Sequence, residues 1–150
     1  MEQLNDLLNS SLNQKVISSR AGGGAGTIWL IRFENNTNVM IWCTWRIEQE
    51  NLVLATSTDD STAITGRMAV ATNLLEKEQV KLLSYELSEQ YDLILHFEKG
   101  YCARIFCDVS YSQTEDGGDG LDVNWEYSNV NTNTNVTVSN EYKLIFQNYN

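Results

Sequence analysis

The sequence contains no proline, a single histidine and no apolar run long enough to span a membrane. Without proline, the turns depend on glycine, asparagine and aspartate, which tolerate the backbone conformations that turns require. His96 is the one imidazole that a Ser-His-Asp or Cys-His site could use, which narrows the possible nucleophilic chemistry. The opening residues MEQLNDLLNS lack the basic and apolar segments of a signal peptide, so we expect a soluble, cytoplasmic protein with no membrane association.

Cysteine is also scarce: there are three, an odd number, and each lies inside an apolar stretch. Cys43, Cys102 and Cys107 are therefore expected to be buried, reduced thiols rather than a disulfide framework. Their spacing contains no CxxC pair of the kind used by zinc sites, and no serine lies in a G-x-S-x-G motif. We expect no metal, no cofactor and no catalytic residue.

Positive charge is in short supply, because 20 acidic residues face 10 basic ones and the net charge is −10. Such a surface repels nucleic acids and anionic membranes. It suits a protein that is simply soluble, or one that binds a basic partner. With 150 residues, of which 42% are hydrophobic, the chain is expected to fold as one domain, residues 1–150, around a hydrophobic core.

Glycine concentrates in one stretch, AGGGAGT at residues 21–27. A phosphate-binding P-loop would need a lysine and a helix after these glycines, but the residues that follow, TIWLIRF, alternate like a strand. The stretch is therefore predicted to connect two strands. A close approach of its backbone to the other half of the chain or to a partner would explain why it has almost no side chains.

An internal repeat is visible when the chain is shifted by 64 residues, which places WLIRFENNTNVMIWC (29–43) over LILHFEKGYCARIFC (93–107). Each copy reads as a β-hairpin, because apolar residues alternate on both sides of a turn at Asn35-Asn36 or Lys99-Gly100. The matched residues are Val16/Val80, Phe33/Phe97, Glu34/Glu98, Ile41/Ile105 and Cys43/Cys107. Repeat unit one is placed at about residues 1–63 and unit two at about residues 64–150.

The elements around the hairpins complete the fold prediction. Short helices are expected at LNDLLNSSL and MAVATNLLEK, and Trp125-Glu126 repeats Trp45-Arg46 after an insertion. The segment SNVNTNTNVTVSN reads as a polar edge strand or a loop, and EYKLIFQ as the closing strand. The predicted fold is mainly β, with α+β as the alternative. It is an internally duplicated antiparallel β-meander whose two related halves form a sandwich or a strongly bent sheet, with one or two short helices.

Acidic residues in two turns are the candidates for partner binding. TEDGGDGLD partly matches a calcium-binding repeat, but it occurs once and lacks EF-hand spacing, so it reads as an exposed acidic recognition loop. Thr58-Asp59-Asp60-Ser61 closes a strand pair and reads as a turn. The candidate partner-binding residues are Asp59, Asp60, Glu115, Asp116, Asp119 and Asp122.

The pattern WLIRFENN…IWCTWRIE followed by DLILHFEKG…RIFCDVS…NWEY resembles small bacterial proteins of the immunity type that are found with polymorphic toxins. The resemblance covers residues 14–127 and rests on the spacing of apolar and aromatic residues. It implies a non-enzymatic cytoplasmic protein that binds one cognate toxin and occludes a basic surface of it.

Two other functions stay open at this point. A small-molecule or carbohydrate-binding β-domain could line a cleft with Trp42, Trp45 and Trp125, and a deep apolar pocket would favour it. A hydrolase would need His96 or a pair of carboxylates in a cleft.

Overall fold

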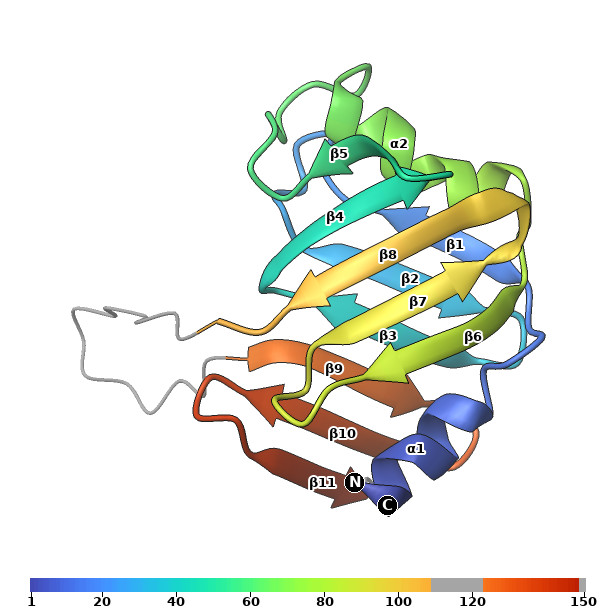
Figure 1. The fold of residues 1–150 in the computed structure, drawn as a ribbon, viewed down its shortest axis with the longest axis vertical. Helices are drawn as coiled ribbons and strands as arrows, with labels where there is room; N and C mark the ends of the chain where they lie inside the picture. Colours follow the sequence, from blue (N-terminus) through green and yellow to red (C-terminus); the bar gives the residue numbers. More distant parts are fainter. Residues whose placement is uncertain (109–122, 149–150) are drawn as a thin grey trace.

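Two antiparallel β-sheets pack face to face, with a helix at each side of the sandwich (Figure 1). The computed structural model describes residues 1–108 and 123–148. The first sheet has the order β1-β2-β3-β9-β10-β11, formed by β1 (Val16–Arg20), β2 (Trp29–Phe33), β3 (Thr37–Ile41), β9 (Val123–Asn129), β10 (Thr134–Ser139) and β11 (Leu144–Asn148). The second has the order β5-β4-β8-β7-β6, formed by β5 (Leu52–Thr56), β4 (Thr44–Gln49), β8 (Tyr101–Phe106), β7 (Leu93–Phe97) and β6 (Leu82–Leu87). The mainly β prediction is confirmed, and the two sheets form a sandwich.

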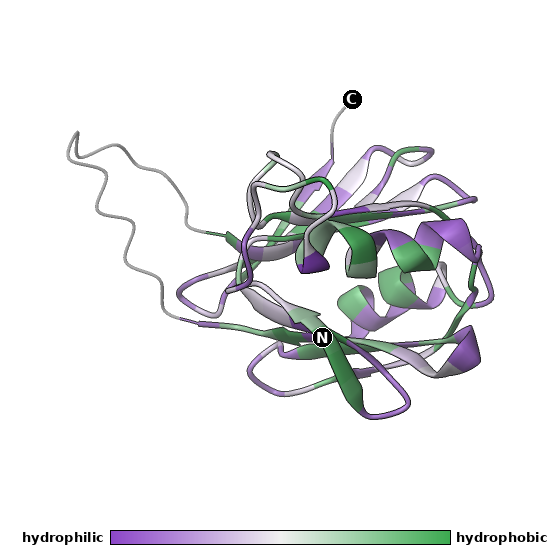
Figure 2. Ribbon diagram, turned by 90° about the horizontal axis from the view of Figure 1, so that it is seen from above, coloured by the Kyte–Doolittle hydropathy of each residue, from purple (hydrophilic) through white to green (hydrophobic). Residues whose placement is uncertain are grey.

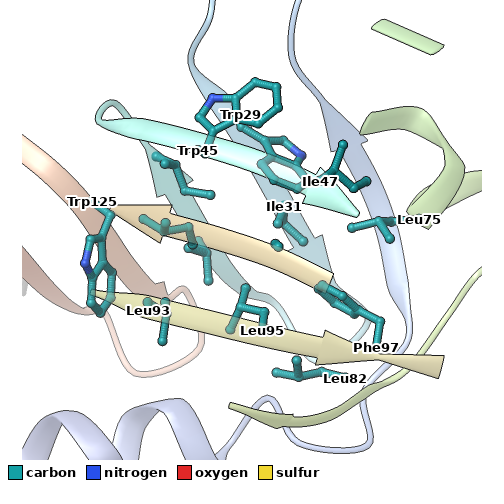
Figure 3. Packing of buried hydrophobic residues seen from close by; sticks show 14 of the residues in the cluster. Trp29, Ile31, Trp45, Ile47, Leu75, Leu82, Leu93, Leu95, Phe97 and Trp125 are labelled. Atoms are coloured by element: carbon teal, nitrogen blue, oxygen red, sulfur yellow. The ribbon is translucent and has the colours of Figure 1, made fainter. Parts of the chain in front are cut away.

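The strand faces alternate as the sequence predicts. In β2, Trp29, Ile31 and Phe33 are buried whereas Arg32 is exposed, and β7 buries the three equivalent positions. These side chains fill the space between the sheets (Figure 3). Trp29 packs against Trp45 of the opposite sheet, with 4.8 Å between the ring centroids. The core is thus built from alternate residues of facing strands.

Each helix closes one side of the sandwich with apolar side chains at helical spacing. In α1 (Glu2–Asn9), Leu8 is buried, and Tyr85 of β6 donates a hydrogen bond to a carbonyl of this helix at 3.1 Å. In α2 (Arg67–Lys77), Met68 is buried, and the helix packs against β1 and β5. Figure 2 shows both helices between the two layers of strands. Neither helix in the described part of the chain has the length and apolarity needed to cross a membrane.

The two halves share backbone details at positions 64 or 66 residues apart. The Lys15 amide donates to Glu34 Oε1 at 3.2 Å, and the Lys81 amide donates to Glu98 Oε1 at 2.7 Å. The pairs β1–β2 and β6–β7 each contain a bulge at the same place. Lys15 and Lys81 also form an antiparallel bridge with each other. Equivalent positions of the two halves therefore meet between the sheets.

The first strands of the halves correspond at an offset that differs from the predicted one. Val16 pairs with Phe33, and Leu82 pairs with Phe97. Leu82, and not Val80, thus holds the place of Val16. The predicted shift of 64 residues is therefore wrong by two residues in the first strand of each half. The reason is that the β6–β7 connection is shorter than the glycine-rich β1–β2 connection.

The halves also exchange strands. After each hairpin the chain crosses to the other sheet, so that β4 pairs with β8 and β9 pairs with β3. Trp45 and Trp125, near the starts of β4 and β9, make equivalent hydrogen bonds. The Trp45 indole N–H donates to the Thr27 carbonyl at 2.8 Å, and the Trp125 indole N–H donates to the Tyr91 carbonyl at 2.8 Å. Thr27 and Tyr91 are themselves 64 residues apart. The descent of the halves from a duplication stays a prediction that these correspondences favour.

The sequence suggested that the polar strand β10 lies at an edge of a sheet, but it lies in the interior of one. It lies between β9 and β11, and Val136 and Val138 are fully buried. Thr137 Oγ1 donates to Asn135 Oδ1 at 3.1 Å, and Asn135 Nδ2 donates to Ser128 Oγ at 3.4 Å. A polar sequence is stable inside this sheet because neighbouring polar side chains satisfy one another.

Tyr101, at the start of β8, is expected to make the stability of the protein vary with pH in the alkaline range. Its hydroxyl donates a hydrogen bond to the Glu78 carboxylate, and burial together with this carboxylate raises the pKa of Tyr101 to about 12. The folded protein therefore holds this proton more tightly than the unfolded chain, so the free energy of unfolding should fall as pH rises from about 10 to about 12. Tyr101→Phe should remove this part of the loss, measured by urea unfolding at a series of pH values. An unchanged alkaline slope in the variant would contradict the assignment.

Candidate functional site

The loops at one end of the sandwich form the candidate interaction surface, at the left of Figure 1. Strand pairing brings them together, since Thr44 at the start of β4 lies opposite Phe106 at the end of β8. The glycine-rich connection also belongs to this end, because the Gly24 amide donates a hydrogen bond to the Ser61 carbonyl at 2.8 Å. We define the loop end as residues 21–28, 42–43, 57–66, 88–92, 107–108 and 140–143.

Most of the net charge of the described residues lies in the loop end. Outside it, the described chain is almost neutral, with ten acidic and nine basic residues. The loop end has one basic residue, Lys143, and six acidic ones: Asp59, Asp60, Glu89, Asp92, Asp108 and Glu141. Five of the six net negative charges of the described chain are therefore on this surface. Loops held by a rigid scaffold are the usual location of binding residues.

Two of the six predicted partner-binding residues, Asp59 and Asp60, lie in the loop end. The other four lie in the segment 109–122, outside the described residues: Glu115, Asp116, Asp119 and Asp122.

Asp59 and Asp60 are held in place by hydrogen bonds within their own loop. Asp59 Oδ2 accepts from the Thr56 amide at 2.7 Å. Asp60 Oδ1 accepts from the amide and the hydroxyl of Thr62 at 2.9 and 2.7 Å, and these bonds lower the pKa of Asp60. The turn interpretation is confirmed, and both carboxylates are fixed in direction because their oxygen atoms shape the loop.

Sequence reasoning missed Asp92 and Asp108, which belong to the same surface. Asp92 Oδ1 accepts from the Cys107 amide at 2.7 Å, and Asp108 Oδ2 accepts from Thr44 Oγ1 at 3.0 Å. The signal was present in the predicted hairpin. Asp92 precedes its first strand and Asp108 follows its second, so the hairpin register alone places both at its open end.

The glycine-rich connection approaches the second half of the chain at one residue. Gly22 has φ +78°, and a Cβ there would lie 3.1 Å from Met68 Cγ and 3.2 Å from the Ala69 amide of α2. Gly23 has more room, with its nearest neighbours at 3.8 Å, and a Cβ on Gly24 would meet nothing within 4 Å. The expected close approach exists, and it is between the two halves. It gives a structural reason for one of the four glycines.

Gly22→Ala is expected to destabilise the protein by about 1–3 kcal/mol more than Gly24→Ala. Both residues have positive φ, so both variants carry the same kind of backbone strain. Only Gly22→Ala also pushes a methyl group into α2. The measurement is chemical unfolding of the two variants side by side. Equal losses would show that the contact with Met68 has no energetic consequence.

The three tryptophans that might have lined a cleft are not on one surface. Trp45 and Trp125 are core residues, 1% and 0% exposed, whereas Trp42 is 37% exposed. Trp42 and Trp45 do not share a strand either, because β3 ends before Trp42 and β4 begins after Cys43. Trp42 and Cys43 form the crossover between the sheets, and both amides donate to the Asn124 carbonyl. An aromatic cleft built from these three residues is excluded.

A second polar group lies on the outer face of the β4–β8 pair, away from the loop end. Glu48 Oε2 accepts from Arg46 Nε at 2.5 Å and from Arg104 Nε at 2.8 Å. Cys102 lies between Glu48 and His96 in the strand register, but burial raises the pKa of its thiol. A protonated thiol is a weak nucleophile, so this row has the geometry of ion pairs on a sheet face rather than of an activated cysteine.

His96 lies between two buried residues of β7, on the outward face of the strand, and its Nε2 lies 2.6 Å from Glu86 Oε2. The His96 side chain is partly exposed and the Glu86 side chain is largely exposed. Exposed pairs of this kind contribute little to stability. Within residues 1–108 and 123–148, no group of three His, Cys, Asp or Glu side chains could hold a metal ion.

Comparisons with protein-family models, curated proteins and solved structures found no match. The chemistry of the loop end therefore rests on its own exposed side chains. Besides the acids, these include four large apolar ones: Ile28, Trp42, Ile64 and Tyr142. Exposed aromatic side chains are enriched in surfaces that bind other proteins.

Proposed function

We propose that the protein is a non-enzymatic binding module of the immunity type, which acts in the cytoplasm by covering a basic surface of a cognate toxin. The observation that carries this proposal is the concentration of negative charge on the loop end. A basic partner meets complementary charge there, whereas nucleic acids and anionic membranes meet repulsion. The pattern-level resemblance to immunity proteins supports the same class of partner.

Charge and apolar contact have separate tasks in this proposal. The acidic loops steer the partner and orient it, which raises the association rate more than the final affinity. Trp42 and Ile64 are exposed among those loops and supply apolar area that a partner can bury. The hydrogen bonds of Asp59 and Asp60 reduce the cost of ordering the surface on binding.

Copurification with the toxin encoded beside this protein's gene tests the proposal. The tagged protein should retain the toxin at low ionic strength and release more of it as salt screens the charges. Coexpression should restore growth to cells that produce the toxin. A toxin that stays fully active in excess protein, and that does not bind at any salt concentration, would overturn the proposal.

A small-molecule binding domain is the second candidate, favoured by a groove of about 500 Å³ between β1, the glycine-rich connection and α2. Its walls combine apolar Val70 and Leu74 with the cations of Arg20 and Lys77, so an anionic ligand with an apolar part would fit. Ligands that raise the melting temperature of the wild type, and not of Asn73→Trp in the same groove, would favour this function over the first.

A further inference from the structure

Cys43 and Cys107 face each other at the loop end. In the β4–β8 pair, Thr44 lies opposite Phe106, and each step back along β4 is matched by a step forward along β8. Extending this register by one position beyond the ends of the two strands places Cys43 beside Cys107. Opposed residues of antiparallel strands have Cα atoms about 4.5–5.5 Å apart, which lies inside the range of about 4.4–6.8 Å found for disulfides.

Hydrogen bonds anchor both residues, and their side chains are neighbours. The Cys107 thiol donates to the Tyr91 carbonyl at 3.2 Å, and the Cys43 side chain lies close enough to Cys107 for the two to interact. The backbone is anchored at both positions, because the Cys43 amide donates to the Asn124 carbonyl at 3.0 Å and the Cys107 amide to Asp92 Oδ1 at 2.7 Å. The interaction with Cys107, burial and the nearby Asp108 carboxylate raise the pKa of Cys43, so its thiol is held in the neutral form.

Cys102 provides an internal contrast. It lies five residues before Cys107 on the opposite face of β8, beside Glu48 and His96. A sulfur there points away from the other two, so the fold pairs two of the three cysteines and leaves the third alone.

We propose that Cys43 and Cys107 are a redox pair that closes to a disulfide by exchange with a small oxidised thiol such as oxidised glutathione. The Cys107 thiolate, the more exposed of the two, attacks one sulfur of the small disulfide and releases one small thiol. In the mixed disulfide the Cys107 thiol, the largest cause of the raised pKa of Cys43, is gone. Cys43 then loses its proton, its thiolate attacks the Cys107 sulfur of the mixed disulfide, and the second small thiol leaves. Two protein thiols are oxidised to one disulfide, and the small disulfide is reduced to two thiols.

The bond ties the Trp42–Cys43 crossover, which leads into β4, to the residue that follows β8, and so crosslinks the loop end of this strand pair. Because the two cysteines are 64 positions apart, it restricts the unfolded chain far more than the folded one. The melting temperature should rise by roughly 5–15 °C on oxidation. This inference goes beyond the proposed function and does not depend on any partner.

The experiment uses the full chain, incubated in its native state with oxidised or reduced glutathione and then alkylated under denaturing conditions. The reduced protein should be alkylated at all three cysteines and the oxidised protein at Cys102 alone. Protease digestion of the oxidised protein should yield peptides joined through Cys43 and Cys107. Cys102→Ser is the matched control and should close the bond as the wild type does, whereas Cys43→Ser should stop at a mixed disulfide on Cys107.

Three alkylated cysteines after oxidation, or a crosslink that includes Cys102, would overturn the proposal. An oxidised protein that melts no higher than the reduced one would overturn the stabilising role of the bond. The peptide map of the wild type decides the question even when a serine variant fails to fold, because it needs no substitution.

Discussion

Trp45→Ala is expected to lower the free energy of unfolding by about 3–5 kcal/mol. The indole is 1% exposed, packs against Trp29 and donates a hydrogen bond to the Thr27 carbonyl at 2.8 Å. Its removal leaves a cavity between the sheets and takes away the donor of the Thr27 carbonyl. For a chain of this size the melting temperature should fall by roughly 6–20 °C, measured by calorimetry.

Trp42→Ala is the matched control, because it makes the same chemical change three residues earlier on a side chain that is 37% exposed. It should cost about 1 kcal/mol or less. Trp125→Ala, at the equivalent place in the second half, should resemble Trp45→Ala, since its indole makes the same kind of bond to Tyr91. Similar losses at Trp42 and Trp45 would contradict the placement of Trp45 in the core.

Neutralising four acids of the loop end should slow association with the proposed basic partner by about tenfold or more at low ionic strength, with little effect on stability. The variant combines Asp59→Asn, Asp60→Asn, Glu89→Gln and Glu141→Gln. The asparagines keep an oxygen that can accept the hydrogen bonds of Thr56 and Thr62, so the 57–66 loop should keep its shape. Stopped-flow association over a series of salt concentrations measures the effect, and the variant should show a flatter salt dependence than the wild type.

A second quadruple variant controls for total charge, because it also removes four negative charges but leaves the loop end intact. It combines Glu2→Gln and Asp6→Asn on α1 with Glu34→Gln and Glu50→Gln at turns of the opposite end. This variant should associate within about twofold of the wild type at moderate salt, since charges beyond a Debye length are screened. Equal slowing in the two variants would show that net charge, and not its placement, attracts the partner.

Much of the fold could be predicted from short-range patterns. The hairpins at 29–41 and 93–105 follow from alternation around a turn, and the helices follow from leucine spacing. The match of Trp125 with Trp45 across the insertion is consistent with their equivalent hydrogen bonds. The prediction failed at β10, where polar residues indicated an edge, because buried polar side chains that bond to one another look the same in sequence as exposed ones.

The candidate site was only partly predictable. The sequence gives its acidic character, and it placed Asp59 and Asp60 in a turn, where they lie. The hairpin register places Asp92 and Asp108 at one open end, but the sequence did not show that this end lies on the same surface as Asp59 and Asp60, because that depends on how β4 pairs with β8 and β5. It also suggested that Cys43 and Cys107 are equivalent core-like positions without indicating that they oppose each other, a contact that arises from the β4–β8 pair.

Local sequence therefore specified the strands, the turns, the helices and the acidic charge of this protein, since each depends on residues that are near one another in the chain. The packing of the whole chain set the partners of β4 and β9, the interior place of β10 and the gathering of acidic loops at one end. Pairing between distant strands depends on how both sheets fill one core, and no short pattern contains that information. The loop end, where both the proposed partner and the proposed disulfide would act, is a product of that pairing.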